Sequence, residues 1–178
     1  MSTQCWCLAL NKSRRLHFTT QLKALYTQET LNSDIHNKIE IAIEQLETAL
    51  KLFLSGQSYV SALTLGGAAE EILGMALELD DLENSLQELY KNYHQPGLEW
   101  INPPKTWKEF TTDGKNKVRN AVKHLSRTDD LSFQADIQDE AVWMLVRATE
   151  NYNRLGFKPT DLMHEFEEWF YEHYVGLL

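Results

Sequence analysis

The chain has 178 residues, of which 43% are hydrophobic, and its 17 basic and 26 acidic side chains give a net charge of −9. This length favours a single domain with a sizeable core, and no stretch approaches the roughly 20 apolar residues that a membrane span needs. The first ten residues lack a basic segment followed by a long apolar run, so we expect no signal peptide and a cytoplasmic protein.

A first amphipathic helix is predicted to begin near residue 34. Its apolar stripe recurs at spacings of three and four residues and consists of Ile39, Ile43, Leu46, Leu50 and Phe53. Ser33 or Asp34 is expected to cap its start, and Gly56 stands where a glycine would end it.

A second helix is expected from about 58 to 79, joined to the first by a short turn that makes the two helices antiparallel neighbours. It is apolar over most of its circumference, which is typical of the central helix of a bundle. The pair Gly66-Gly67 in its middle costs roughly 1 kcal/mol per glycine relative to alanine. We interpret this pair as a place of close approach by another helix or by a second protomer, with a local kink as the alternative.

A third helix is predicted over 81–92, followed by an irregular stretch over 93–105. The segment 106–109, Thr-Trp-Lys-Glu, matches a capping box and begins a short helix. Asp113 is expected to cap the next helix. The residues that this helix should turn inward are Val118, Val122 and Leu125.

Two further helices complete the predicted fold. One runs over 136–155, and an aromatic one follows Pro159-Thr160. No alternating run of apolar and polar residues indicates a strand. We therefore predict an all-α, antiparallel up-and-down bundle of four to five core helices, with an N-terminal extension over 1–32, a core over 33–155 and a C-terminal aromatic helix over 156–178.

Basic side chains gather in one strip of this acidic chain. Residues 105–127 carry seven of them against two acidic ones, whereas the rest of the chain carries ten against 24. The seven are Lys105, Lys108, Lys115, Lys117, Arg119, Lys123 and Arg127. A polyanion would be drawn to this strip and repelled elsewhere. The alternative is a lysine-rich helix face exposed to solvent.

The basic strip contains the segment 119–124, Arg-Asn-Ala-Val-Lys-His. Arginine can hold a phosphate with its planar fork of donors, and histidine exchanges a proton near neutral pH. Arg119 and His124 lie about 140° apart on an ideal helix, so a site shared by two protomers around a two-fold axis suits them better than one copy. The alternative is that Arg119 pairs with a nearby carboxylate and His124 occupies the helix end.

Three segments, in this order, resemble HEPN domains. Segment 38–77 is similar to the opening helix pair of the family, including the run Ala-Ala-Glu-Glu over 68–71. Segment 119–124 is similar to the family's Arg-polar-x(3–5)-His motif, with Asn120 as the polar residue, and 139–155 fills the place of the closing helix. The resemblance implies a homodimeric, metal-independent endoribonuclease that acts as a toxin or defence effector.

The resemblance also implies an antitoxin or a minimal nucleotidyltransferase as a partner. In HEPN toxins silenced by such a nucleotidyltransferase, a tyrosine two residues after the histidine is modified. Ser126 stands at that position here, so the chain departs from the pattern of this form of silencing.

In this interpretation His124 is the general base or acid, Arg119 stabilises charge on the phosphate, and Asn120 orients one of them. The cations expected to hold the RNA backbone without reading its sequence are Lys115, Lys117, Lys123 and Arg127. DNA is disfavoured as a substrate because it lacks the 2′-hydroxyl that would attack.

No metal or cofactor is expected from the sequence. There is no P-loop pattern, and Cys5 and Cys7, the only cysteines, make at most half of a zinc site. Two alternatives to an enzyme stay open: a non-catalytic module that binds a nucleotide, RNA or an acidic protein, and a purely structural dimer.

Overall fold

The computed structural model describes residues 35–95, 103–125 and 131–176. The chain divides into two units, 1–36 and 37–178, and the account below concerns the second. Every regular element in the described part is a helix, which confirms the all-α class. The predicted N-terminal extension lies outside the described residues.

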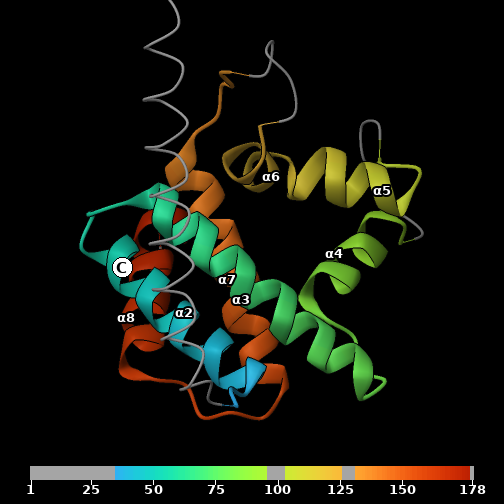
Figure 1. The fold of residues 1–178 in the computed structure, drawn as a ribbon. Helices are drawn as coiled ribbons and strands as arrows, with labels where there is room; N and C mark the ends of the chain where they lie inside the picture. Colours follow the sequence, from blue (N-terminus) through green and yellow to red (C-terminus); the bar gives the residue numbers. More distant parts are fainter. Residues whose placement is uncertain (1–34, 96–102, 126–130, 177–178) are drawn as a thin grey trace, which may run out of the picture. The chain divides into compact units, whose positions relative to one another are not determined.

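The first two helices of this unit form the predicted pair: α2 (Lys38–Leu54) and α3 (Tyr59–Leu79) (Figure 1). Asn37 caps α2, because its side-chain oxygen accepts a hydrogen bond from the N–H of Ile39 at 2.9 Å. The expected cap at residue 33 or 34 is therefore wrong, since the residue just before the first helical turn already fills this role.

The turn between α2 and α3 is built around Gly56, as predicted. Gly56 has a φ of +65°, and its N–H donates to the carbonyl of Phe53 at 2.9 Å. The N–H of Gln57 donates to the carbonyl of Leu52 at 3.1 Å. These two bonds satisfy the last carbonyls of α2 in a Schellman motif, and the hydroxyl of Ser58 then caps α3.

The remaining elements, in chain order, are α4 (Ser85–Tyr93), α5 (Trp107–Phe110), the π-helix η1 (Thr111–Lys115), α6 (Lys117–Lys123), α7 (Ile137–Arg154), α8 (Asp161–Phe170) and the π-helix η2 (Tyr171–Val175). The segments α5, η1 and α6 follow one another almost without a break, and Figure 1 shows them in yellow as a nearly continuous helical rod. We call them the α5–α6 rod.

Capping side chains set the starts of α4 and α5. Asn84 caps α4 in a reciprocal capping box, so this helix begins at Ser85 rather than at the predicted residue 81. Thr106 caps α5, as predicted. The carboxylate of Glu109 accepts a hydrogen bond from the N–H of Lys105 at 2.8 Å and so satisfies the backbone one residue before the cap.

Helix α6 differs from the prediction at both ends. Asp113 lies inside η1 and does not cap α6, which begins after Asn116. The helix ends at Lys123, and Leu125, expected to point inward, is 69% exposed. The inward residues that do lie partly buried against the core, as predicted, are Val118 and Val122.

The core lies between α2, α3, α7 and α8, with α3 in contact with both α2 and α7 along its length. Its buried side chains include Leu46 and Leu50 of α2, Leu63 and Leu73 of α3, Leu145 and Ala148 of α7, and Met163 and Phe166 of α8. The stripe predicted from the sequence for α2 therefore faces this core.

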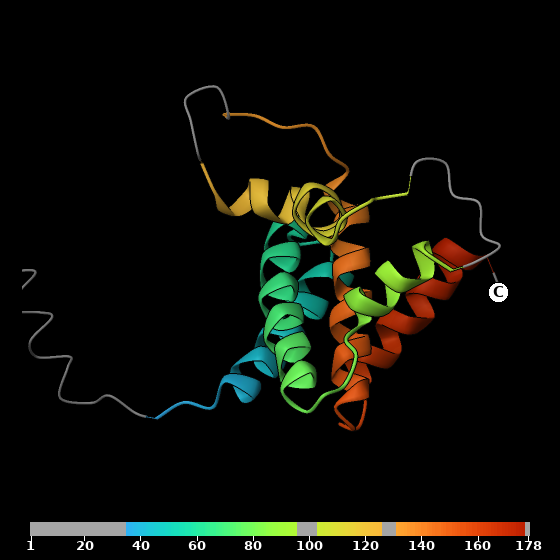
Figure 2. The ribbon, with the colours of Figure 1, turned by 90° about the vertical axis from the view of Figure 1, so that its right-hand side faces the viewer.

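Helices α3 and α7 run parallel to each other. Gly66 of α3 lies against Leu145 of α7, and two turns further on Gly74 lies against Asn151, so the residue numbers rise together. Both ribbon views show the two helices side by side (Figures 1 and 2). The connection between them, residues 80–136, carries α4 and the α5–α6 rod.

By length and composition alone, α3 could cross a membrane, and it is the single helix of the described part for which this holds. The mean hydropathy of its most apolar stretch is 1.3, and half of that stretch is buried inside the protein. Its buried Glu70 pairs with Arg147 of α7. The expectation that no stretch approaches a membrane span is therefore wrong by length and composition, although the burial and charge pairing of α3 are those of the predicted central helix.

The aromatic C-terminal helix packs on α2. The ring of Phe53 meets Phe166 at 5.6 Å and Trp169 at 4.7 Å, both edge to face. Beyond α8, the hydroxyl of Tyr174 donates to Asp139 at the start of α7, at 2.9 Å. These aromatic residues therefore serve packing within the chain.

Candidate functional site

The predicted motif lies in a groove of about 430 Å³ between α3 and the α5–α6 rod, which we call the motif groove. Arg119, Asn120 and His124 all line it, and so does Lys123. One protomer therefore brings the arginine, the amide and the imidazole of the motif to a single concave surface.

Arg119 is buried, with 6% of its surface exposed, and its side chain lies directly against Gly67 of α3. Its guanidinium forms an ion pair with the carboxylate of Glu71, which borders the motif groove. The Nε atom of Arg119 is buried and has no hydrogen-bond partner among the described residues. The arginine is thus fixed at one end and keeps one donor unused.

A second arginine–glutamate pair fixes the start of α6. The guanidinium of Arg147 lies 3.4 Å from the carboxylate of Glu70, and both side chains are 6% exposed. Arg147 also donates to the side-chain oxygen of Asn116 at 3.1 Å, and Asn151 donates to the carbonyl of Glu70 at 3.3 Å. The neighbouring glutamates of α3 therefore anchor α6 through two different arginines.

His124 departs from the helical path that its sequence spacing predicted. Helix α6 ends at Lys123, and His124 is the C-cap, with an extended backbone (φ −129°, ψ 131°). Its N–H still donates to the carbonyl of Asn120 at 3.0 Å. Because the chain leaves the helix here, the angle of about 140° expected for two helical residues five apart does not apply, and the exposed His124 lines the same groove as Arg119.

The alternative interpretation of the motif is realised in the same geometry. Arg119 does pair with a carboxylate, that of Glu71, and His124 does occupy the end of α6. The pairing of Arg119 and the place of His124 are therefore the same whether the motif is structural or catalytic. Only an assay of activity distinguishes the two interpretations.

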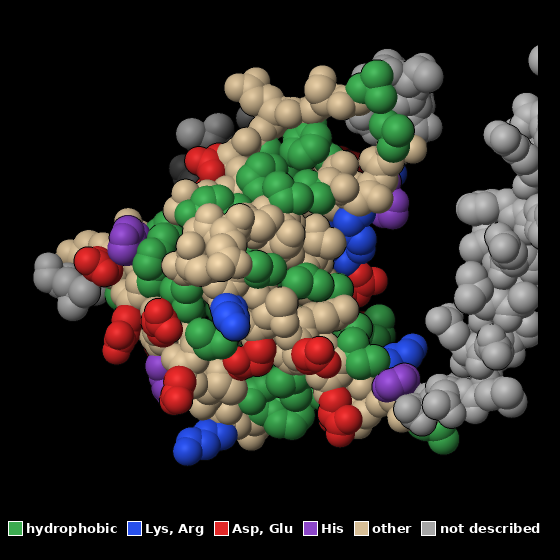
Figure 3. Space-filling view, turned by 60° about the vertical axis from the view of Figure 1, so that its left-hand side comes forward, with side chains coloured by type: hydrophobic (Ala, Val, Ile, Leu, Met, Phe, Trp, Pro, Cys, Tyr) green, Lys and Arg blue, Asp and Glu red, His purple; other side chains and the backbone are tan. Residues whose placement is uncertain are grey.

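The predicted phosphate-binding cations are dispersed. Lys123 lines the motif groove, whereas the Nζ of Lys115 lies 5.8 Å from the ring centroid of Tyr93 and borders another hollow. Lys117 is exposed but does not line the groove, and Arg127 lies outside the described residues. On the face that Figure 3 shows, acidic side chains are spread among hydrophobic ones, and the described basic side chains lie at separate places and form no continuous patch.

The glycine pair of α3 is used within the chain. A Cβ at Gly66 would lie 3.0 Å from Leu145 of α7, and a Cβ at Gly67 would lie 2.8 Å from both Cδ and Nε of Arg119. Both glycines are buried. The predicted close approach by other helices is therefore confirmed, and the pair gives no support for a contact with a second protomer.

Sequence reasoning missed two features of the groove. Glu71 entered only as part of the Ala-Ala-Glu-Glu run, although its position four residues after Gly67 places both on one side of α3. Trp107, which is 42% exposed and lines the groove, was noted only within a capping box. The signal that the sequence offered was a tryptophan within twenty residues of a candidate catalytic histidine.

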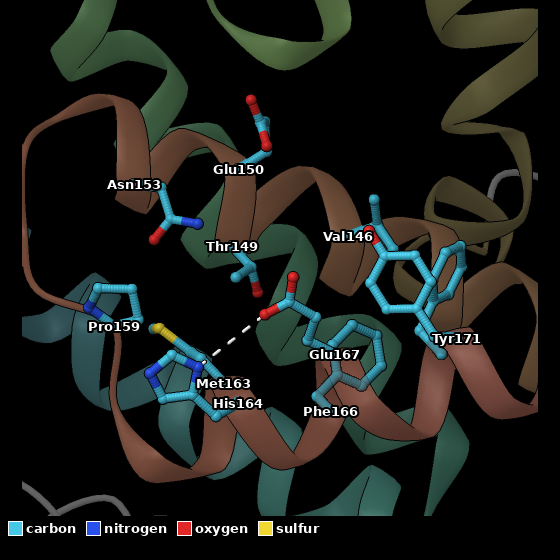
Figure 4. A pocket seen from close by; sticks show the side chains of 11 residues that line it. Val146, Thr149, Glu150, Asn153, Pro159, Met163, His164, Phe166, Glu167 and Tyr171 are labelled. Atoms are coloured by element: carbon cyan, nitrogen blue, oxygen red, sulfur yellow. Dashed lines mark ion pairs between the residues drawn. The ribbon is translucent and has the colours of Figure 1, made fainter. Parts of the chain in front are cut away.

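A separate hollow of about 200 Å³ lies between α7 and α8 (Figure 4). His164 and Glu167 lie on its rim, 3.9 Å apart, and Thr149 faces it from α7. It contains none of the predicted site residues. In the described part of the chain, no group of three or more histidine, cysteine or acidic side chains is placed to hold a metal ion.

Comparison of the chain with protein-family models, with curated proteins and with solved structures gave no match. The function proposed below therefore rests on the residues of the motif groove and on their geometry.

Proposed function

We propose that this protein is a metal-independent endoribonuclease of the HEPN type, with Arg119, Asn120 and His124 as its site. The observation that carries the proposal is that all three side chains line one groove. Two independent features of the fold favour it: a glycine of α3 gives Arg119 its place, and the end of α6 releases His124 from the helix.

In the proposed reaction His124 takes the proton from a 2′-hydroxyl, and the freed oxygen attacks the adjacent phosphorus. The bond from the 2′-oxygen to phosphorus forms while the bond to the 5′-oxygen breaks, and that oxygen receives a proton as it leaves. The products are a 2′,3′-cyclic phosphate and a free 5′-hydroxyl. Arg119 stabilises the negative charge that builds on the phosphate oxygens, and Asn120 orients His124 or the phosphate.

The proposed enzyme is a homodimer with two motif grooves facing one shared cleft. Each copy of the motif supplies one imidazole, whereas cleavage needs one base and one acid. A second copy of His124 supplies the missing partner. Lys123 in the groove, with Lys115, Lys117 and Arg127, would attract the RNA backbone.

The HEPN-type bundle, the toxin or defence role, an antitoxin or nucleotidyltransferase partner and a cytoplasmic location belong to the same proposal. Helices α3 and α7 are parallel and are connected through α4 and the α5–α6 rod. This is compatible with an up-and-down bundle in which α4 is the short helix that runs antiparallel to both. DNA is not expected to be cut.

A second candidate function is a non-catalytic module that binds a nucleotide, RNA or a protein. The burial of Arg119 and its pairing with Glu71 favour it, because a phosphate would have to compete with this carboxylate. The two candidates differ in one measurable outcome, cleavage of RNA.

The test is incubation of purified protein with single-stranded RNA in the presence of EDTA. We expect cut products that end in a 2′,3′-cyclic phosphate, while matching DNA and RNA methylated at the 2′-oxygens stay intact. Sedimentation should give about twice the chain mass of 20.7 kDa. Intact RNA at all protein concentrations would contradict the ribonuclease and leave the non-catalytic alternatives.

A further inference from the structure

The side chains of the α5–α6 rod that line the motif groove form one continuous row. They are Trp107, Thr111, Asn116, Asn120 and His124, together with their neighbours Thr112, Arg119 and Lys123. The principal spacings are four, five, four and four residues. A regular α-helix would carry such a row away from the groove at the five-residue step.

The π-helix η1 accounts for the five-residue step. The N–H of Asn116 donates to the carbonyl of Thr111 at 2.7 Å, which is the i→i−5 bond of a π-helix. The extra residue restores the alignment, so Trp107 and Thr111 before the π-helix face the same groove as Asn116 and Asn120 after it. π-Helical turns of this kind occur frequently at functional sites.

The two ends of the row differ in chemistry. At one end are His124 and Lys123, with Arg119 beneath them. At the other end of the rod is Trp107, whose ring is held edge-on by Tyr90 at 5.3 Å. Trp107 keeps 42% of its surface exposed.

The opposite wall of the motif groove is acidic but internally paired. Glu70 is held by Arg147 and Glu71 by Arg119. Glu78 accepts hydrogen bonds from the side chains of Asn84 and Gln87, each at 2.8 Å. Such a wall repels phosphates. The exocyclic amino groups of bases, in contrast, can donate hydrogen bonds to the oxygens of its carboxylates and amides.

We propose that the motif groove binds an unpaired RNA strand, with its phosphates toward Lys123 and His124 and one base stacked on Trp107. This inference rests on the proposed function, to which it adds Trp107 as a residue that binds a base of the strand. Bases in a duplex are stacked on each other and paired, so only a single-stranded segment can offer a free face to the indole.

The test measures binding of a single-stranded RNA of about 12 nucleotides, methylated at the 2′-oxygens so that it cannot be cut. Trp107→Ala should weaken binding about five- to 150-fold, the usual effect of losing one stacked base, and Trp107→Phe should retain most of the affinity. The same RNA in a duplex should bind far more weakly to the wild-type protein.

Trp143→Ala is the matched control, because Trp143 is 45% exposed, lies on α7 and does not line the motif groove. Its affinity for the single strand should equal that of the wild type. If Trp107→Ala fails to fold, quenching of tryptophan fluorescence by RNA replaces it, and the quenching should be smaller in Trp107→Phe than in the wild type.

The outcomes separate this inference from the function on which it rests. Cleavage of unmodified RNA with no dependence on Trp107 would overturn the inference and leave the ribonuclease intact. Binding that depends on Trp107, without cleavage, would support the strand site and remove the catalytic proposal. Equal affinity for single strand and duplex, or no binding of either, would overturn the inference.

Discussion

Gly67 of α3 lies directly beneath the side chain of Arg119 of α6, so close that a Cβ at this glycine would come within 2.8 Å of both Cδ and Nε. Because glycine adds no side chain, the arginine can lie flat on the helix and still reach Glu71. The position of the motif arginine therefore depends on the absence of a single methyl group on another helix.

Gly67→Ala should displace Arg119 from this position and lower RNA cleavage nearly as far as Arg119→Ala does. Alanine is the better helix former by about 1 kcal/mol, which offsets part of the steric cost, so the protein should still fold. Cleavage rates and the far-ultraviolet circular dichroism spectrum of the variant check this.

The neighbouring substitution Gly66→Ala is the control. Its new Cβ would lie 3.0 Å from Cδ2 of Leu145, a core contact remote from Arg119. We expect a change in melting temperature with the cleavage rate preserved. Equal activity of the two alanine variants would contradict the role assigned to Gly67.

His124→Ala should lower cleavage roughly 10²–10⁴-fold, the usual contribution of a general acid or base. Arg119→Ala should lower it roughly 10²–10³-fold, the usual contribution of one donor that stabilises charge in the transition state. Because His124 is exposed at a helix end, its replacement should leave the melting temperature almost unchanged. If His124→Ala cuts RNA as fast as the wild type, His124 has no catalytic role and only ends helix α6.

Lys123 and Lys117 provide a matched test of the electrostatic role of the groove. Both are exposed residues of α6, but only Lys123 lines the motif groove. Lys123→Gln should lower the salt dependence of RNA binding by about 0.7 in the slope of log K against log salt, the value for one phosphate contact on a single strand. Lys117→Gln should change it less, and the reverse order would place the strand elsewhere.

The two glutamates that anchor α6 should differ in their effect on stability. Glu70→Gln leaves the buried charge of Arg147 without its partner, and breaking such a pair costs about 3–5 kcal/mol. Glu71→Gln should cost less, because the Glu71 side chain is 65% exposed and solvent screens its charge. Urea unfolding of both variants measures the two losses, and equal values would contradict the assignment.

The stability of the folded protein at high pH should depend on the ionisation of the Tyr174 hydroxyl. Burial, the hydrogen bond to Asp139 and the negative charges of Asp139 and Asp136 raise the pKa of Tyr174 to about 12, from an ordinary value of 10.0. The folded state thus keeps this proton longer than the unfolded state. The resulting stabilisation is complete below pH 10 and is lost as the pH rises toward about 12.

Tyr174→Phe removes this group and supplies the comparison. The variant should melt below the wild type at pH 8, and the difference should shrink between pH 10 and about 12. The melting temperature of both proteins across this range is the measurement. A difference that stays constant with pH would show that Tyr174 does not carry the titration.

Local signals made most helices predictable. Gly56 and the cap Thr106 act through bonds to residues only a few positions away, and the stripe of α2 repeats within a single helix. Such features are determined by the nearby sequence and need no knowledge of the partner helices.

The details of the site depend on distant contacts and could not be predicted in this way. Asn116 is held by Arg147, which lies 31 residues further along the chain, and this contact accompanies the π-helix that displaced the expected cap. Arg119 pairs with Glu71, which lies 48 residues earlier in the sequence. A pairing with some carboxylate was foreseeable, but which carboxylate it would be depends on the packing of α3 against α6.

The parallel arrangement of α3 and α7 governs when the site can form during synthesis. The motif lies in the connection between these helices, and Glu70 meets Arg147 only after α7 has been made. Closing this long connection delays folding, because non-local contacts form late. A nascent chain that still lacks α7 could pair α3 with α2, but it would lack Arg147 and therefore one of the two anchors of α6. In the proposed ribonuclease, α6 would gain its anchor on Glu70 only once α7 had been made, so the site would be completed after the motif itself had been translated.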